Sequence, residues 1–132
     1  MVKESLIAAA IQARERAYVP YSGYKVGAAL LCKSGKIYTG CNVENASYGA
    51  SICAERTAAV KAVSEGEQQF VAMAVVADGP VPGSPCGICR QFLYEFNPKL
   101  DLILADLRGN IIETTLERYL PEAFGAKHLS RE

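Results

Sequence analysis

The chain has 132 residues, the size of one ordinary domain, so we expect a single domain over residues 1–132. Half of the residues are apolar and 21% are charged, which excludes a disordered, collagen-like or fibrous chain. Fourteen Lys and Arg balance fourteen Asp and Glu, so no global positive field would attract nucleic acid or an acidic membrane. We therefore expect neither of these partners.

The apolar segments and the cysteines indicate the cellular compartment of the protein. The longest apolar stretches, Val26–Cys32 and Phe70–Ala77, fall far short of the roughly 20 residues that cross a bilayer. The N-terminus lacks the design of a secretory signal, because charged residues interrupt its short apolar segment Leu6–Ile11. Five cysteines without an export signal favour free thiols or metal ligands over a disulfide framework. We expect a cytoplasmic protein.

The first half of the chain predicts a helix, two strands and a second helix. Apolar residues recur at helical spacing over Lys3–Ala17. Two strands, Tyr24–Cys32 and Lys36–Val43, flank a turn of hairpin length. Ser51 can cap a helix over Ile52–Val63, which Gly66 follows.

The second half alternates strands and helices. Phe70–Ala77 is an uninterrupted apolar run, typical of a central strand covered on both faces, and the crossover that precedes it is long enough for parallel pairing with the second strand. Cys86–Phe96 predicts a helix. Leu100–Ala105 and Ile111–Thr114 are too closely connected for a helical crossover, so we expect an antiparallel hairpin there. A short helix over Leu116–Leu120 completes the order αββαβαββα.

Three thiols occur at two predicted helix starts. Cys86 and Cys89 form a CxxC pair on one helix face, and Cys53 lies at the start of the preceding helix. Helix N-termini lower cysteine pKa values and favour thiolates, the form that binds metals. If both helix starts meet at one sheet edge, three ligands and an open position give the pattern of a catalytic zinc site.

A carboxyl group lies beside these thiols. Glu55 is two positions after Cys53, so it points away from the ligand direction, but it could take a proton from a water molecule that the metal activates. The alternative interpretation of Glu55 is purely structural: an acidic residue in the first turn stabilises the positive end of a helix. Cys32 and Cys41 are expected to be packing residues, and His128, in the polar tail, is expected to be solvated.

The combination of these residues resembles the cytidine deaminases. The paired signature consists of Cys53-Ala54-Glu55-Arg56-Thr57-Ala58 and Pro85-Cys86-Gly87-Ile88-Cys89-Arg90-Gln91. The likeness extends through residues 20–29 and 40–48 and covers nearly the whole chain. It implies a three-layer α/β/α sandwich with a mixed five-stranded sheet whose last strand pair is antiparallel. It also implies a homotetramer with shared active sites.

The resemblance assigns roles to individual residues. Cys53, Cys86 and Cys89 would hold one zinc ion per subunit, with Glu55 as the proton shuttle, in the hydrolytic deamination of cytidine and 2′-deoxycytidine in pyrimidine salvage. Arg56 and Gln91, inside the signature, would support this centre; Arg56 could donate hydrogen bonds to the thiolates. The implied substrate contacts are the ribose pair Asn42 and Glu44, the Ala54 N–H, the Ser84 carbonyl, and the rings of Tyr24, Tyr48 and Phe124.

Other functions remain open from the residues. A thiol–disulfide oxidoreductase would use Cys86 and Cys89 but leaves Cys53 and Glu55 unexplained. A non-enzymatic zinc module would need a fourth ligand. An editor of DNA or RNA should carry a basic surface, whereas this chain is neutral. A deaminase of a cytosine-containing nucleoside antibiotic would use the same zinc chemistry, and the ribose-like pair is the argument against it.

Overall fold

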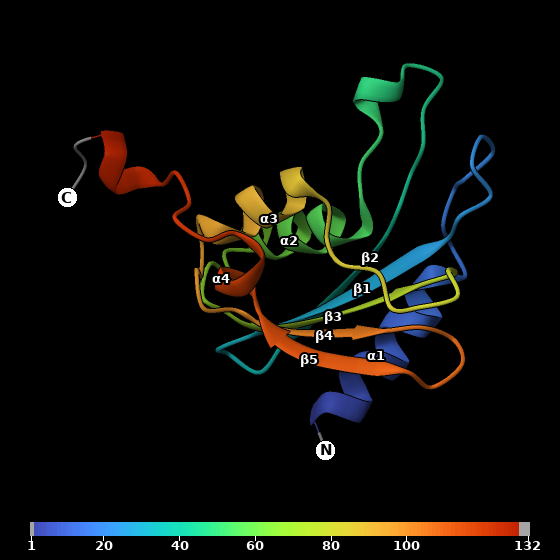
Figure 1. The fold of residues 1–132 in the computed structure, drawn as a ribbon, viewed down its shortest axis with the longest axis horizontal. Helices are drawn as coiled ribbons and strands as arrows, with labels where there is room; N and C mark the ends of the chain where they lie inside the picture. Colours follow the sequence, from blue (N-terminus) through green and yellow to red (C-terminus); the bar gives the residue numbers. More distant parts are fainter. Residues whose placement is uncertain (1, 130–132) are drawn as a thin grey trace.

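A computed structural model describes residues 2–129 as a three-layer arrangement around one mixed sheet. Helix α1 covers one face of the sheet, and α2, α3 and α4 lie on the opposite face (Figure 1). The elements follow the predicted order: α1 (Val2–Arg14), β1 (Val26–Cys32), β2 (Ile37–Cys41), α2 (Ala54–Ser64), β3 (Phe70–Ala77), α3 (Gly87–Tyr94), β4 (Asp101–Ala105), β5 (Ile111–Thr115) and α4 (Leu116–Tyr119). The predicted sandwich and element order are confirmed.

The five strands are arranged in the order β2-β1-β3-β4-β5. β3 and β4 are parallel, and every other neighbouring pair is antiparallel, including the predicted final hairpin. The expectation that β3 pairs with the second strand is wrong, because β1 lies between β2 and β3. The long segment between β2 and β3 therefore joins two strands that are not neighbours in the sheet, because they lie on opposite sides of β1.

The hydrophobic core has one cluster on each side of the sheet. Leu6 and Ala10 of α1 pack against the first side, and Ala54, Ala58 and other residues of α2 pack against the second. β3 contributes to both clusters and is buried over nearly its whole length, as its apolar run predicts. β3 is therefore shared by the two clusters on either side of the sheet.

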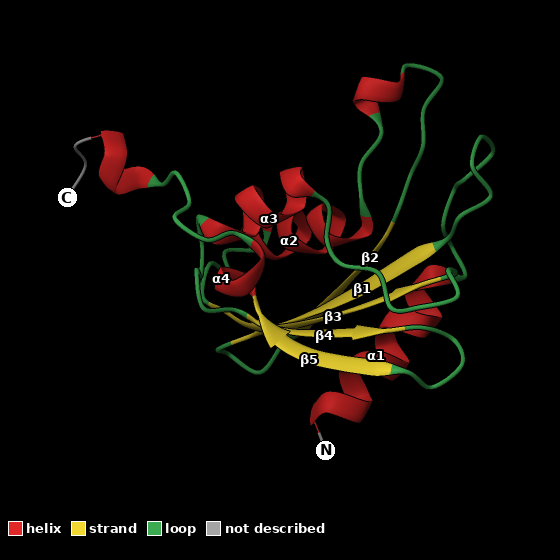
Figure 2. Cartoon of the chain, viewed as in Figure 1, coloured by secondary structure: helices red, strands yellow, loops and turns green. Residues whose placement is uncertain are grey.

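Two segments extend beyond these layers (Figure 2). The connection from β2 to α2 carries a short 3-10 helix, η1 (Tyr48–Ala50), at its far end, and the chain after α4 leads to a second one, η2 (Ala126–Leu129). Large aromatic side chains on these segments face solvent: Tyr48 is 76% exposed and Phe124 is 58% exposed. Within residues 2–129, no helix has the length and apolar character needed to cross a membrane.

Candidate metal centre and active site

The three thiols of the signature lie at the starts of α2 and α3. Cys53 is the N-cap residue of α2, and Cys86 is the N-cap residue of α3. Neither side chain makes the capping hydrogen bond that a Ser or Asp would make at this position, so both sulfurs point elsewhere. Cys89 follows in the first turn of α3 and is fully buried. The two helix N-termini thus bring their partial positive charge to one place.

The positions of the sulfurs fit a zinc ion. All three Sγ atoms lie within 4.8 Å of one another, and those of Cys53 and Cys86 are 3.6 Å apart. Two sulfurs that each lie about 2.3 Å from a tetrahedral zinc ion are about 3.8 Å apart, so the observed spacing matches shared coordination. No other group of three or more potential ligands is this close together in residues 2–129. Three ligands leave one position for a reacting molecule.

The thiols are electrostatically coupled to each other and to Arg56. The pKa of Cys53 lies well below its usual value, first because the Cys89 thiol donates a hydrogen bond to it and further because Arg56 Nη2 donates at 3.4 Å. The pKa of Cys89 is raised by that hydrogen bond and by burial. Arg56 Nε is buried and has no hydrogen-bond partner in the described part of the chain. The guanidinium is thus held against the thiol cluster.

Glu55 is a buried carboxyl group beside the cluster. Its side chain is 5% exposed, although it belongs to the first turn of α2. Burial is the main cause that raises the pKa of Glu55 to about 7, and the charge of Cys53 acts in the same direction, whereas the Glu55 backbone N–H and Arg56 oppose the shift. A carboxyl group with a pKa near neutrality is suited to both accepting and donating a proton.

A pocket of about 230 Å³ opens over these groups. Cys53, Ala54, Glu55 and Cys86 line one part of it. The remaining lining comes from the ends of strands and the loop before α3: Tyr24, Val26, Asn42, Val75, Ala77, Gly83 and Ser84. Five of the eight predicted catalytic and substrate-binding residues therefore line one cavity: Tyr24, Asn42, Ala54, Glu55 and Ser84.

Hydrogen bonds fix two walls of this pocket. Asn42 Oδ1 accepts from the Val26 N–H at 2.9 Å, and Asn42 Nδ2 donates to the Tyr24 carbonyl at 2.8 Å. The amide still has one N–H and one lone pair for a ligand. On the other wall, Arg90 Nε donates to the Pro85 carbonyl at 2.7 Å and Arg90 Nη2 donates to Ser84 Oγ at 3.1 Å. Arg90 thus holds the loop that carries Ser84, a role that the sequence did not reveal.

The comparisons with known proteins agree with this geometry. A sequence model of the family described as the cytidine and deoxycytidylate deaminase zinc-binding region matches residues 1–104. The chain belongs to the cytidine deaminase family. It is 55% identical to the cytidine deaminase of Sporosarcina psychrophila over 96% of this chain and 94% of that protein. It is 53% identical to that of Halalkalibacterium halodurans over 98% and 99% of the two chains.

Solved structures of cytidine deaminases have the same fold. The crystal structure of the Burkholderia pseudomallei enzyme matches with a TM-score of 0.91 at 48% identity, over 94% of this chain and all of that one. The Mycobacterium tuberculosis enzyme matches with a TM-score of 0.80 at 41% identity, over 92% and 96% of the two chains. The zinc-binding region of the family and the thiol cluster together identify zinc as the cofactor of this cytidine deaminase family member.

Glu44 and Tyr48 lie in a different pocket from the thiols. That pocket has a volume of about 370 Å³ and is lined by Tyr21, Ser22, Glu44, Asn45, Tyr48 and Ser51. The Glu44 carboxylate accepts hydrogen bonds from the Ser22 hydroxyl and from the Tyr21 and Ser22 N–H groups. These bonds lower its pKa, the Ser22 hydroxyl contributing most. The ribose role of Glu44 in this family member stays a prediction.

The C-terminal residues of the predicted site also lie apart from the pocket. Phe124 is not among the residues that line it; its ring stacks on His128 with 5.3 Å between the centroids. Gln91 Nε2 donates to the Phe124 carbonyl at 2.9 Å and so ties α3 to this segment. His128 is exposed and its Nδ1 accepts from the Gly125 N–H. The roles of Phe124 and Gln91 remain predictions.

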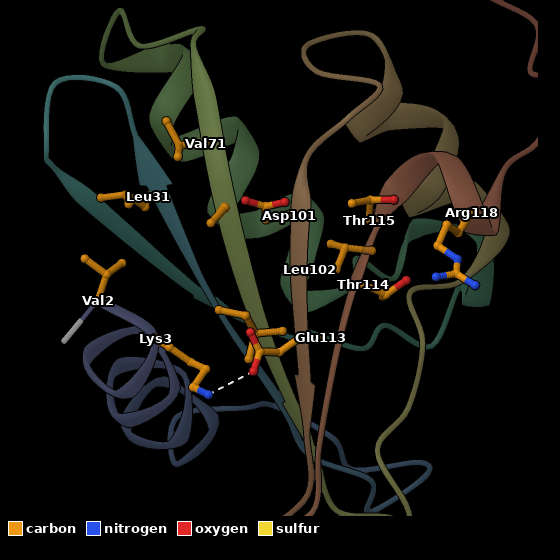
Figure 3. A pocket seen from close by; sticks show the side chains of 12 residues that line it. Val2, Lys3, Leu31, Val71, Asp101, Leu102, Glu113, Thr114, Thr115 and Arg118 are labelled. Carbon is orange, nitrogen blue, oxygen red and sulfur yellow. Dashed lines mark hydrogen bonds and ion pairs between the residues drawn. The ribbon is translucent and has the colours of Figure 1, made fainter.

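A larger cavity lies away from the thiols. It has a volume of about 640 Å³ and lies between the first turn of α1 and the strands β1, β3, β4 and β5. Figure 3 shows its lining, in which the Lys3 ammonium pairs with the Glu113 carboxylate at 2.8 Å. None of the cysteines lines it. Chemistry rather than size therefore favours the smaller pocket beside the thiols as the candidate functional site of this cytidine deaminase family member.

Proposed function

We propose that this protein catalyses the hydrolytic deamination of cytidine and 2′-deoxycytidine to the corresponding uridine nucleosides and ammonia, as part of pyrimidine salvage. One observation carries the proposal: Asn42 and a buried carboxyl group with a raised pKa line the same pocket as Cys53 and Cys86, two of the three thiols that are spaced for zinc. Membership of the cytidine deaminase family supports it. In a thiol–disulfide oxidoreductase, neither Cys53 nor the buried Glu55 would have a purpose.

Glu55 moves the protons in the proposed reaction. Zinc held by Cys53, Cys86 and Cys89 supplies the Lewis acidity that makes a water molecule reactive at neutral pH. Glu55 takes a proton from that water and passes it to N3 of the base as oxygen adds to C4. Glu55 then takes the second proton from the new hydroxyl group on C4 and transfers it to the amine, which leaves as ammonia when the C4–N bond breaks and the C4 carbonyl forms. Its burial keeps bulk water from competing for these protons.

Residues around the pocket orient the nucleoside in this proposal. The Ala54 N–H donates to the base carbonyl, the Ser84 carbonyl accepts from the leaving amine, and the Tyr24 ring packs beside the base. The free N–H of Asn42 supports donation to the ribose 3′-hydroxyl, whose own O–H would donate to the Glu44 carboxylate. Arg56 offsets negative charge on the thiolates, and Gln91 steadies α3 against the C-terminal segment.

We further propose that the domain over residues 1–132 assembles as a homotetramer in the cytoplasm. The exposed rings of Tyr48 and Phe124, on segments that extend from the layers, support sharing of active sites between subunits (Figure 2). Five free cysteines support a reducing compartment. Sedimentation tests the assembly: a tetramer whose activity falls on dilution to monomers is expected, and a fully active monomer would refute it.

An ultraviolet assay over cytidine, 2′-deoxycytidine, cytosine and adenosine tests the function. We expect turnover of the two cytosine nucleosides and much slower reaction of the free base, because the base lacks the sugar that Asn42 and Glu44 bind. A zinc-loaded protein that acts on none of the four compounds would reject the proposal. A cytosine-containing nucleoside antibiotic, added as a fifth substrate, tests the alternative that such a compound is preferred.

A further inference from the structure

The backbones of β2 and α2 are in unusually close contact at Gly40. A Cβ atom at this position would lie 2.5 Å from the Ala58 nitrogen and 2.6 Å from the Ala54 carbonyl oxygen. Both distances are below 3.0 Å, and Cβ atoms essentially never lie this close to another heavy atom outside their own local backbone. The obstructing atoms belong to the helix backbone, so no side-chain rotation could relieve the contact. Any residue other than glycine would therefore force the start of α2 and β2 apart.

The first turn of α2 is the part of the helix that carries the chemistry. Ala54 O and Ala58 N are the acceptor and donor positions of its second i to i+4 hydrogen bond, which follows the bond from the Thr57 N–H to the Cys53 carbonyl. Cys53 immediately precedes this turn, and Glu55 lies within it. The Thr57 hydroxyl and N–H both bind the Cys53 carbonyl, at 3.1 and 3.0 Å. Displacement of the turn would therefore move Cys53 and Glu55 together.

The other half of the thiol cluster is also held by contacts outside the β2–α2 attachment. Cys86 and Cys89 belong to α3, whose start is fixed through Arg90, which binds the Pro85 carbonyl at 2.7 Å and the Tyr119 carbonyl at 3.0 Å. Movement of α2 away from β2 would change the 3.6 Å separation between the sulfurs of Cys53 and Cys86. Zinc coordination tolerates distance errors of only about 0.2 Å.

We propose that Gly40 is a positioning residue that sets the place of Cys53 and Glu55 relative to α3, and thereby the geometry of the metal centre. The inference rests on the proposed function of those two side chains. Neighbouring contacts place Gly40 within a continuous attachment of α2 to β2. Lys61 Nζ donates to the Thr39 carbonyl at 2.6 Å, next to Gly40 in the chain. Asn42, two residues beyond Gly40, lines the same pocket as Glu55.

The test compares Gly40→Ala with a control that weakens the fold on the other face of the sheet. Leu6→Ala serves as the control, because Leu6 is fully buried in the cluster beneath α1 and lies apart from α2. Ala58→Ser adds one buried atom to the residue of α2 whose backbone nitrogen lies nearest the Gly40 position, and it is measured in parallel as a milder perturbation. For each folded variant, zinc affinity is measured by competition with a chelating indicator. The visible spectrum of the cobalt-substituted protein reports the arrangement of the thiolates.

We expect both Gly40→Ala and Leu6→Ala to lower the melting temperature. Only the variants at the β2–α2 contact should alter the cobalt spectrum, and Gly40→Ala should lower zinc affinity by about tenfold or more, with a smaller effect of Ala58→Ser. A native cobalt spectrum and native zinc affinity in the contact variants would overturn the proposal. Neither readout uses a nucleoside, so absence of cytidine turnover in the unaltered protein would reject the proposed function without affecting this result.

Discussion

Substitution of Arg56 tests quantitatively whether this side chain offsets the negative charge of the zinc–thiolate centre. Three thiolates and one Zn²⁺ sum to a charge of minus one, which weakens the metal as a Lewis acid. Arg56 is half-buried and donates from Nη2 to Cys53 Sγ at 3.4 Å. Opposite unit charges about 4 Å apart attract each other by about 4 kcal/mol at an effective dielectric constant of 20, before the cost of desolvating them. Arg56 is therefore able to stabilise the thiolate form substantially.

We expect Arg56→Ala to weaken zinc binding by about 10- to 100-fold, the usual effect of removing a group that hydrogen-bonds a metal ligand. This range corresponds to about 1.4–2.8 kcal/mol, well within the electrostatic attraction available. Arg56→Lys restores the charge but not the planar fork of donors, so it should recover only part of the loss.

Zinc affinity is measured at fixed pH by competition with a chromophoric chelator. The melting temperature of each metal-free protein serves as the control, because it separates weaker coordination from a weaker fold. If Arg56→Ala bound zinc as tightly as the unaltered protein, the charge argument would be refuted. The N-termini of α2 and α3 would then have to stabilise the thiolates without the arginine.

Two further changes test residues away from the metal. Glu44→Gln should raise the KM for cytidine by roughly tenfold or more, since hydrogen bonds to charged groups contribute about 1.5–3 kcal/mol, and should leave the slow reaction of free cytosine unchanged; equal effects on both substrates would argue against a ribose contact. Asp106 is buried, and its pKa is lowered, first by the Asn110 side chain at 2.7 Å and further by the Arg108 and Asn110 N–H groups. Its stabilising effect is therefore present above the ordinary carboxyl pKa of about 3.9 and disappears as the pH falls through the lower folded-state value. Asp106→Asn should lower the melting temperature at pH 7 and lose most of that difference in strong acid; a difference independent of pH would contradict this.

The sequence predicts those parts of the fold that local patterns determine. Phe70–Ala77 is an uninterrupted apolar run, and β3 has these bounds because both of its faces are covered. The short connection after Ala105 leaves room only for a hairpin, and β4 and β5 are antiparallel. The CxxC spacing and the position of Cys53 also predict that three thiols can meet, because each lies at a helix start.

Local sequence patterns do not predict contacts between segments that are far apart in the chain. Ser51 does not cap α2: the neighbouring Ile52 exchanges backbone hydrogen bonds with Val43, and Ser51 Oγ accepts from the Asn45 N–H, so the helix begins later, with Cys53 at its N-cap. The insertion of β1 between β2 and β3 depends on packing across the whole sheet. The local pattern likewise gives Gly40 no positioning role, since its closeness to α2 exists only in three dimensions.

Replacement of Glu55 by glutamine tests the central claim most directly. The amide has the shape of the carboxyl group but cannot accept the proton that the proposed reaction delivers to it. With zinc content measured on the same samples, Glu55→Gln should hold one zinc ion per chain, as the unaltered protein does. It should deaminate cytidine slower by a factor at or above the top of the range of about 10²–10⁴ for general acid–base groups. Near-normal cytidine turnover by the zinc-loaded variant would contradict the account.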